Sequence, residues 1–325
     1  PLLGKLLRPH QREGVQFCWE CIEGMRGFGG QGCVLADAMG LGKTLQAITL
    51  VWTALRQSVR GNPVASKAII VTPSSLVGGW KKEFKKWLGH RIRPIAVTKG
   101  GKAAKQAVHD FAVSSGTIHG VLIISFDMFR RHADILNGLD GSVREVSVGL
   151  LIVDEGHRLK STDGNKTIRA LSACPAVRRV LLTGTPVQNN LGEFHALVSF
   201  VNPNVLGELA VFRRVFQDPI ERGRDSRATP VERALGEDRS KELARLCSSF
   251  VLRRTQKILA KHLPPRLEAV VFLRLAPIQH RLYDAVVRNV APRAVQSGGA
   301  SALPLITTLN QLCNHPDIAL RRIAE

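Results

Sequence analysis

The chain has 325 residues, 44% of them hydrophobic, and a formal net charge of +20. This hydrophobic content excludes a disordered chain and is sufficient for a large core, so we expect at least one full domain and a second region. The charge favours a polyanionic partner, nucleic acid first, and no apolar run approaches the ~20 residues of a membrane-spanning helix, so we expect no membrane partner.

The first predicted elements are a helix from His10 to about Gly24 and an apolar strand from Val34 to Ala36. A glycine-rich segment, Asp37-Ala38-Met39-Gly40-Leu41-Gly42-Lys43-Thr44, follows the strand and opens an amphipathic helix from Leu45 to about Gln57. This order predicts a phosphate-binding loop. Gly40 and Gly42 would let backbone N–H groups approach the phosphates of ATP. Lys43 would reach the β and γ oxygens, and Thr44 would hold Mg²⁺.

Further apolar strands recur with helical stretches between them. They are Ala68–Val71, Val121–Ser125, Leu150–Val153 and Val180–Thr183. Such alternation predicts an α/β fold, in which a parallel sheet is covered by helices on both faces. The strands end in small, polar or acidic residues, so these residues would gather at the carboxyl edge of the sheet, where ligands bind.

An acidic pair, Asp154 and Glu155, follows the strand Leu150–Val153. Asp154 is placed to meet Mg²⁺, and Glu155 is placed to orient and deprotonate the attacking water. A solvated acidic turn is the alternative, but the upstream phosphate loop favours the catalytic interpretation. Lys43, Asp154 and Glu155 are therefore the predicted catalytic residues of an ATPase.

Beyond about residue 205 the pattern changes. Leu206–Leu263 is rich in Arg, Glu and helix formers and predicts a helical subdomain that ends before Pro264-Pro265. Ala269–Leu273 then predicts a strand, and two helices follow, from Pro277 to about Val290 and another that ends at Asn314. The predicted divisions are 1–205, 206–265 and 266–325.

Several motifs together resemble those of the Swi/Snf-type helicase-like ATPases. Besides the phosphate loop, they are Leu7-Arg8-Pro9-His10-Gln11-Arg12-Glu13-Gly14-Val15, Val71-Thr72-Pro73-Ser74-Ser75-Leu76-Val77, Asp154-Glu155-Gly156-His157-Arg158-Leu159-Lys160, Leu182-Thr183-Gly184-Thr185-Pro186-Val187-Gln188-Asn189-Asn190-Leu191 and Leu312-Cys313-Asn314-His315-Pro316. The acidic motif with Arg158-Leu159-Lys160, Trp80-Lys81-Lys82-Glu83-Phe84 and Phe200-Val201-Asn202-Pro203 resemble the branch of DNA-repair translocases that assist the strand-exchange recombinase.

The resemblance implies a motor with two RecA-like lobes that moves along double-stranded DNA in homologous recombination. Residues 1–205 would form the first lobe, 206–265 a helical insertion and 266–325 the start of the second lobe. Its cofactors would be ATP and Mg²⁺, its partners duplex DNA, the strand-exchange recombinase and nucleosomes, and its location the nucleus.

The resemblance also implies roles for individual residues. Those at the cofactor are Arg8, Gln11, Asp37, Met39, Gly40, Leu41, Gly42, Lys43 and Thr44, of which Arg8 and Gln11 would recognise adenine. Those that couple hydrolysis to DNA contact are Thr183, Gly184, Thr185 and Gln188. Those at DNA are Thr72, Ser74 and Ser75, and the metal would be held by Thr44 and Asp154. Without the resemblance, Gln11 also fits a helix N-terminus and Thr183-Gly184-Thr185-Pro186 a strand-to-helix turn.

Three departures from the family pattern stand out. Ala38 and Ser161 replace the usual Glu and Asn. The sequence also stops before the second-lobe motifs that supply arginines to the γ-phosphate, so we expect residues 1–325 alone to be inactive in ATP hydrolysis. Three other functions stay open: a nucleosome remodeller of another Swi/Snf branch, an RNA helicase, and a non-hydrolysing DNA-binding scaffold. Intact Lys43, Asp154 and Glu155 argue against the scaffold.

Overall fold

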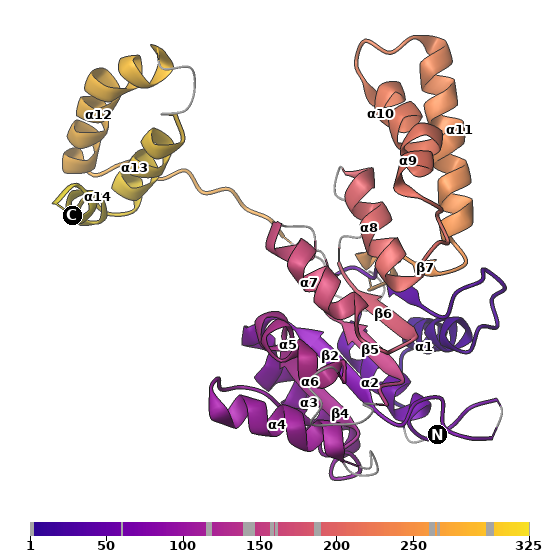
Figure 1. The fold of residues 1–325 in the computed structure, drawn as a ribbon. Coiled ribbons are helices and arrows are strands. Elements are labelled where there is room, and N and C mark those ends of the chain that lie inside the picture. The colour runs from indigo at the N-terminus through magenta and orange to yellow at the C-terminus, as the bar shows by residue number, and fades with distance from the viewer. Residues whose placement is uncertain are drawn as a thin grey trace. The chain divides into compact units, whose positions relative to one another are not determined.

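The computed structural model describes residues 3–59, 61–114, 119–138, 147–156, 159, 162–184, 190–259, 264, 267–296 and 302–324. It divides into two compact units, Pro1–Leu263 and Pro264–Glu325 (Figure 1). Among the described residues, no helix combines the length and apolar character that a membrane crossing requires.

The first unit is built on a seven-stranded sheet in which every pairing is parallel. The strands, in spatial order, are β3 (Ile95–Ala96), β4 (Val121–Ser125), β2 (Ala68–Thr72), β5 (Leu150–Val153), β6 (Arg178–Leu182), β1 (Cys33–Leu35) and β7 (Val251–Leu252). The five predicted strands and the α/β fold class are confirmed. The two that the sequence does not reveal, β3 and β7, have two residues each and are too short to show a pattern.

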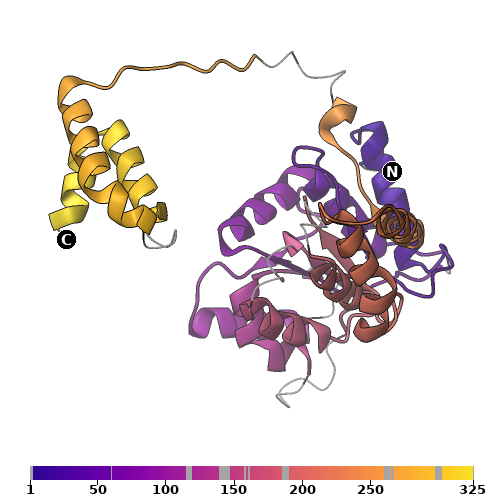
Figure 2. The same cartoon turned by 90° about the horizontal axis from the view of Figure 1, so that it is seen from above.

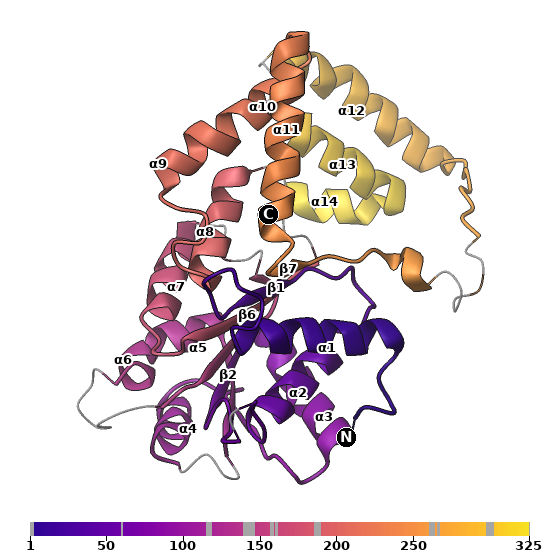
Figure 3. The same ribbon diagram turned by 90° about the vertical axis from the view of Figure 1, so that its right-hand side faces the viewer.

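The central strands are buried on both faces, which explains their continuous apolar runs. Along β2, Ile70 faces one cluster of buried side chains while Ile69 and Val71 face another, and β5 alternates in the same way. The first cluster is covered by α1 (Pro9–Ile22), α2 (Lys43–Ala54) and α3 (Val77–Leu88), which Figure 3 shows together. The second is covered by α4 (Lys102–Val113), α5 (Phe126–Arg131), α6 (Ala133–Leu136), α7 (Thr162–Ser172) and α8 (Leu191–Val201).

Most of the predicted helical subdomain is helical in the structure, but Val251–Leu252 within it form a strand of the sheet. Its elements are α9 (Leu209–Phe212), the π-helical turn η3 (Arg213–Gln217), α10 (Asp218–Arg224) and α11 (Pro230–Cys247), and Figure 2 views them from above. They pack on α8 through a third apolar cluster that includes Phe194, Phe212 and Phe250. After Phe250 the chain pairs with β1 as β7, followed by the short helix η4 (Gln256–Leu259). The boundaries at 205 and 265 stay predictions.

In the described residues of the second unit, an extended segment is followed by the helices α12 (Pro277–Gln296), α13 (Ala302–Asn314) and α14 (Pro316–Ala324). The predicted strand Ala269–Leu273 is wrong for this structure: the segment is extended without strand pairing, and Phe272 is 91% exposed. A strand forms only when a neighbour accepts its backbone hydrogen bonds. Within the described residues, no strand pairs with this segment.

Candidate nucleotide-binding site

The predicted phosphate loop joins β1 to α2. Gly40 and Gly42 have φ angles of +87° and +81°, in the left-handed region that favours glycine. At Gly42, a Cβ would also overlap Nε2 of Gln11. At Gly40, a Cβ would meet nothing within 4 Å, so the backbone there is open to an approaching group. The loop therefore has the shape that brings backbone N–H groups to phosphates.

Lys43, the first residue of α2, is held at the start of the loop. Its Nζ donates to the backbone oxygen of Asp37 at 2.7 Å. Burial lowers the pKa of Lys43, and the nearby Glu155, Asp37 and Asp154 oppose this by favouring the charged form. The ammonium group of Lys43 is therefore close enough to Asp154 and Glu155 for their charges to act on it, as we expect if the phosphate loop and the acidic pair form one site.

Asp154 is 8% exposed, and three donors fix its carboxylate. Oδ2 accepts hydrogen bonds from Oγ1 of Thr72 at 3.1 Å and Nε1 of Trp80 at 2.9 Å, and Oδ1 accepts from the backbone N–H of Glu155 at 2.9 Å. Glu155 has a φ of +52°, a strained conformation for a residue with a side chain. The strain lies at the residue predicted to activate water.

Of the three residues predicted to contact DNA, Thr72 does not fit that role. It is fully buried at the end of β2 and its hydroxyl is bound to Asp154, because β2 and β5 are neighbours and end at the same edge of the sheet. Ser74 and Ser75 lie in the short helix η1 (Ser74–Leu76), where both are exposed, and remain predicted DNA contacts. The basic run Lys81, Lys82, Lys85 and Lys86 is exposed on the following helix, α3.

At the predicted adenine end, Gln11 braces the phosphate loop. Its Oε1 accepts from the backbone N–H of Arg8 at 3.0 Å, and its Nε2 donates to the backbone oxygen of Leu41 at 3.1 Å. Gln11 is therefore tied to both the start of α1 and the loop. Contact of Arg8 or Gln11 with adenine stays a prediction.

A cleft of about 640 Å³ lies where these elements meet. Among its lining residues are Arg8, Gln11, Gly40, Gly42, Thr44 and Asp154. Its size is that of a small-molecule site. A larger hollow of about 770 Å³ lies between α1 and α2, but it contains none of the predicted site residues, so the cleft is the candidate nucleotide site.

The cleft fits Mg²⁺ with a nucleoside triphosphate. The Thr44 hydroxyl and the Asp154 carboxylate are hard oxygen ligands, and Mg²⁺ usually takes one or two protein ligands and completes its shell with phosphate and water. Among the described residues, no cluster of three or more His, Cys, Asp or Glu could hold a metal by itself. Thr44 and Asp154 would leave the rest of the shell of Mg²⁺ to phosphate and water.

The predicted coupling residues start beside the phosphate loop. Thr183, at the end of β6, is 1% exposed and its N–H donates to the backbone oxygen of Leu35 at 3.1 Å. A Cβ on Gly184 would lie 3.6 Å from Cγ of Met39. Thr185 and Gln188 lie outside the described residues.

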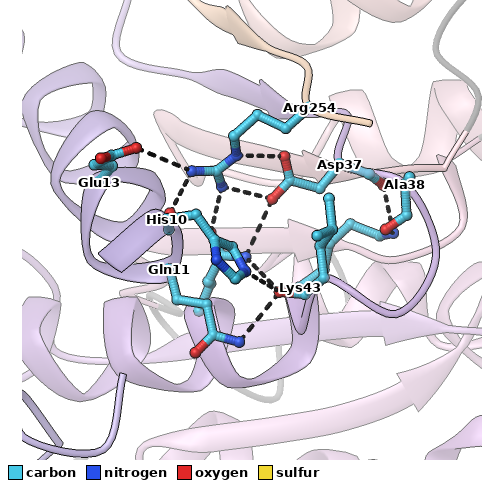
Figure 4. A network of polar contacts seen from close by, with 9 residues as sticks. His10, Gln11, Glu13, Asp37, Ala38, Lys43 and Arg254 are labelled. Carbon is cyan, nitrogen blue, oxygen red and sulfur yellow. Dashed lines mark hydrogen bonds and ion pairs between the residues drawn. The ribbon is translucent and has the colours of Figure 1, made fainter. Parts of the chain in front are cut away.

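Sequence reasoning missed Arg254, which follows β7. Its guanidinium group pairs with the buried carboxylate of Asp37, the first residue of the phosphate loop, so that this carboxylate is not available to the nucleotide (Figure 4). No pattern in the sequence indicated this pair, because Arg254 lies 217 positions after Asp37.

The geometry around Asp154 leads to a prediction. Trp80→Phe in the full-length protein keeps an aromatic ring but removes the N–H donor to Oδ2, so the carboxylate would be less firmly oriented. We expect kcat for ATP hydrolysis to fall roughly tenfold, the scale of one hydrogen bond to a charged group. Steady-state ATPase measurements check this.

Trp19→Phe is the matched control, because Trp19 on α1 lines the larger hollow and not the cleft that holds Asp154. If both variants lowered kcat equally, the orienting role of Trp80 would be wrong.

Residues 10–318 match the SNF2-related domain family. The chain is 46% identical over 331 residues to a human protein named DNA repair and recombination protein RAD54-like, and 47% identical over 333 residues to its namesake from Drosophila mojavensis. All of this chain is aligned, against 43% and 41% of those relatives.

Among solved structures, the chain is similar to the Sulfolobus solfataricus SWI2/SNF2 ATPase core in complex with dsDNA. The TM-score is 0.58 at 26% identity, with 95% of this chain and 58% of that one covered. The Sulfolobus solfataricus SWI2/SNF2 ATPase core domain gives a TM-score of 0.56 at 25% identity, with 95% and 57% covered. The sequence therefore spans less than half the length of these curated relatives and more than half that of the solved cores.

Proposed function

Because this chain belongs to the SNF2-related family, we propose that it is the nucleotide-binding part of an ATP-dependent translocase on duplex DNA that acts in recombinational repair. The observation that carries the proposal is that the phosphate loop and Asp154 line one cleft, while Glu155 lies near enough to Lys43 to favour its charged form. The RAD54-like relatives favour the repair branch over a nucleosome remodeller of another branch.

The proposed division of labour follows from the geometry. Lys43 and the loop N–H groups would hold the β and γ phosphates, and Thr44 with Asp154 would hold Mg²⁺, which neutralises phosphate charge when bound. Asp154 has its orientation fixed by Thr72 and Trp80. Glu155 would accept a proton from the attacking water.

Duplex DNA is the proposed track. Three features support contact with DNA phosphates: the net charge of +20, the exposed Ser74 and Ser75, and the basic run on α3. Contacts with phosphates do not depend on base sequence. The strand-exchange recombinase and nucleosomes are further proposed partners, and the nucleus is the proposed location.

An ATPase assay of the full-length protein tests the proposal, with duplex DNA, single-stranded DNA, RNA or no nucleic acid. We expect stimulation by duplex DNA above all, and binding that weakens with salt by a log–log slope of roughly −0.9 per neutralised phosphate. Lys43→Ala controls for contaminating ATPases. An ATP hydrolysis rate that does not change with DNA, or that rises with RNA alone, would contradict the proposal.

A further inference from the structure

The phosphate loop begins at a buried charge. Asp37 is 0% exposed, directly after the buried residue Ala36, and its backbone oxygen accepts the hydrogen bond from Lys43. A buried carboxylate without a partner is strongly unfavourable. The position of this residue, and with it the path of the loop, therefore depends on what pairs with the carboxylate.

Arg254 provides that partner in a two-pronged arrangement. Its Nε donates to Oδ1 of Asp37 at 2.9 Å and its Nη2 donates to Oδ2 at 2.6 Å. Gln46 of α2 adds a hydrogen bond to Oδ2 at 3.2 Å. A guanidinium group that binds both carboxylate oxygens fixes orientation as well as distance, which a Lys ammonium cannot do.

The same guanidinium group also binds the two helices beside the loop (Figure 4). Nη1 donates to the backbone oxygen of His10 on α1, and Nη2 donates to Oε1 of Gln46 on α2 at 3.1 Å. α1 has Gly14 at this point, where a Cβ would overlap Oε1 of Gln46 and lie 2.6 Å from Nη2 of Arg254. The close approach of α1 thus depends on glycine.

The backbone around Arg254 follows the loop as well. The N–H groups of Ala36 and Ala38 donate to the backbone oxygens of Leu252 and Arg254 at 2.7 and 2.9 Å. Residues 252 to 254 therefore lie along β1 and the first turn of the phosphate loop, and one chain of contacts runs from Arg254 through Asp37 to Lys43.

β7 also connects the loop to the helical segment. Phe250, which precedes β7, is 0% exposed and packs in the cluster formed by α8, α9, α10 and α11. A displacement of that cluster would pull on β7 and hence on the pairing of Arg254 with Asp37, because buried packing transmits strain.

We propose that Arg254 is a positioning residue for nucleotide binding, which holds the phosphate loop in its binding shape through Asp37 and makes that shape depend on the helical segment. The inference rests on the proposed function, since it assigns Arg254 to the same nucleotide site. Arg254 itself contacts Asp37, Gln46 and α1, and acts on the nucleotide only through them.

The test is the affinity of the full-length protein for fluorescent Mg²⁺-ADP, measured by titration. Arg254→Lys keeps the positive charge but loses the two-pronged contact. We expect its Kd to rise roughly 10- to 100-fold, the range for displaced supporting groups. The KM for ATP should rise with it, while kcat changes less. Arg253→Lys is the matched control, because Arg253 is adjacent and exposed, and its Kd should equal that of the parent.

A double variant separates positioning from mere stability. Asp37→Asn with Arg254→Gln removes both buried charges, so its thermal unfolding midpoint should return toward that of the parent. Its Kd should stay raised, because the two-pronged contact is gone. Gly14→Ala, which removes no charge, should also raise the Kd.

Two results would overturn the inference. One is an unchanged Kd in Arg254→Lys. The other is a Kd that recovers together with the melting midpoint in the double variant, which would assign Arg254 to stability alone. Failure of the proposed function looks different, because the parent protein itself would then neither bind Mg²⁺-ADP nor hydrolyse ATP.

Discussion

Glu155→Gln in the full-length protein is expected to bind Mg²⁺-ATP with nearly the parental affinity and to lose DNA-stimulated hydrolysis. Gln is similar in shape but cannot accept the proton of the attacking water at neutral pH. General-base groups contribute about 10²- to 10⁴-fold, so turnover should fall by that factor. Single-turnover hydrolysis separates this step from nucleotide release.

Glu237→Gln is the control, because Glu237 is exposed on α11 and far in sequence from the acidic pair. It should hydrolyse ATP like the parent. Parental turnover by Glu155→Gln would remove Glu155 from the catalytic assignment and leave its strained backbone without that explanation.

Lys43→Ala is expected to have the second large effect, and on a different step. It removes the ammonium group that we propose contacts the β and γ phosphates. Loss of one preorganised electrostatic contact costs about 10²- to 10³-fold in kcat, and here the affinity for Mg²⁺-ATP should fall as well. Equilibrium titration and steady-state hydrolysis measure the two effects separately.

Lys105→Ala, on the exposed face of α4, controls for the loss of one positive charge. It should leave Kd and kcat unchanged. A Lys43→Ala variant with unchanged affinity and rate would mean that the nucleotide does not lie on this loop, and the cleft assignment would be wrong.

Local patterns in the sequence were enough to predict five strands of the sheet, and the two proposed halves of the site follow directly after two of them. The phosphate loop and the acidic pair each consist of adjacent residues after a buried strand, so a short stretch of sequence is enough to identify them. Contacts between residues far apart in the sequence cannot be predicted from such local patterns. The pairing of Asp37 with Arg254 exists only because β7 lies beside β1, and two residues of strand give no periodicity from which to predict it.

At Thr72 and Ala269–Leu273, a local pattern led to a wrong expectation because a distant partner decides the outcome. A hydroxyl after a strand suits DNA contact or a buried hydrogen bond equally, and the neighbouring strand β5, with Asp154 at its end, decided for the latter. Val270, Val271 and Phe272 have the composition of a strand, but pairing depends on a partner and not on composition.

The long separation between Asp37 and Arg254 also bears on how this protein is made. A ribosome adds roughly 5–20 residues per second, and Arg254 lies 217 positions after Asp37, so it is added on the order of 10–40 s later. For that interval the nascent phosphate loop has its carboxylate but not its guanidinium partner. We expect the loop to mature late, after residues as far as 254 have emerged, so that the nascent chain acquires nucleotide affinity only once the helical segment has been made.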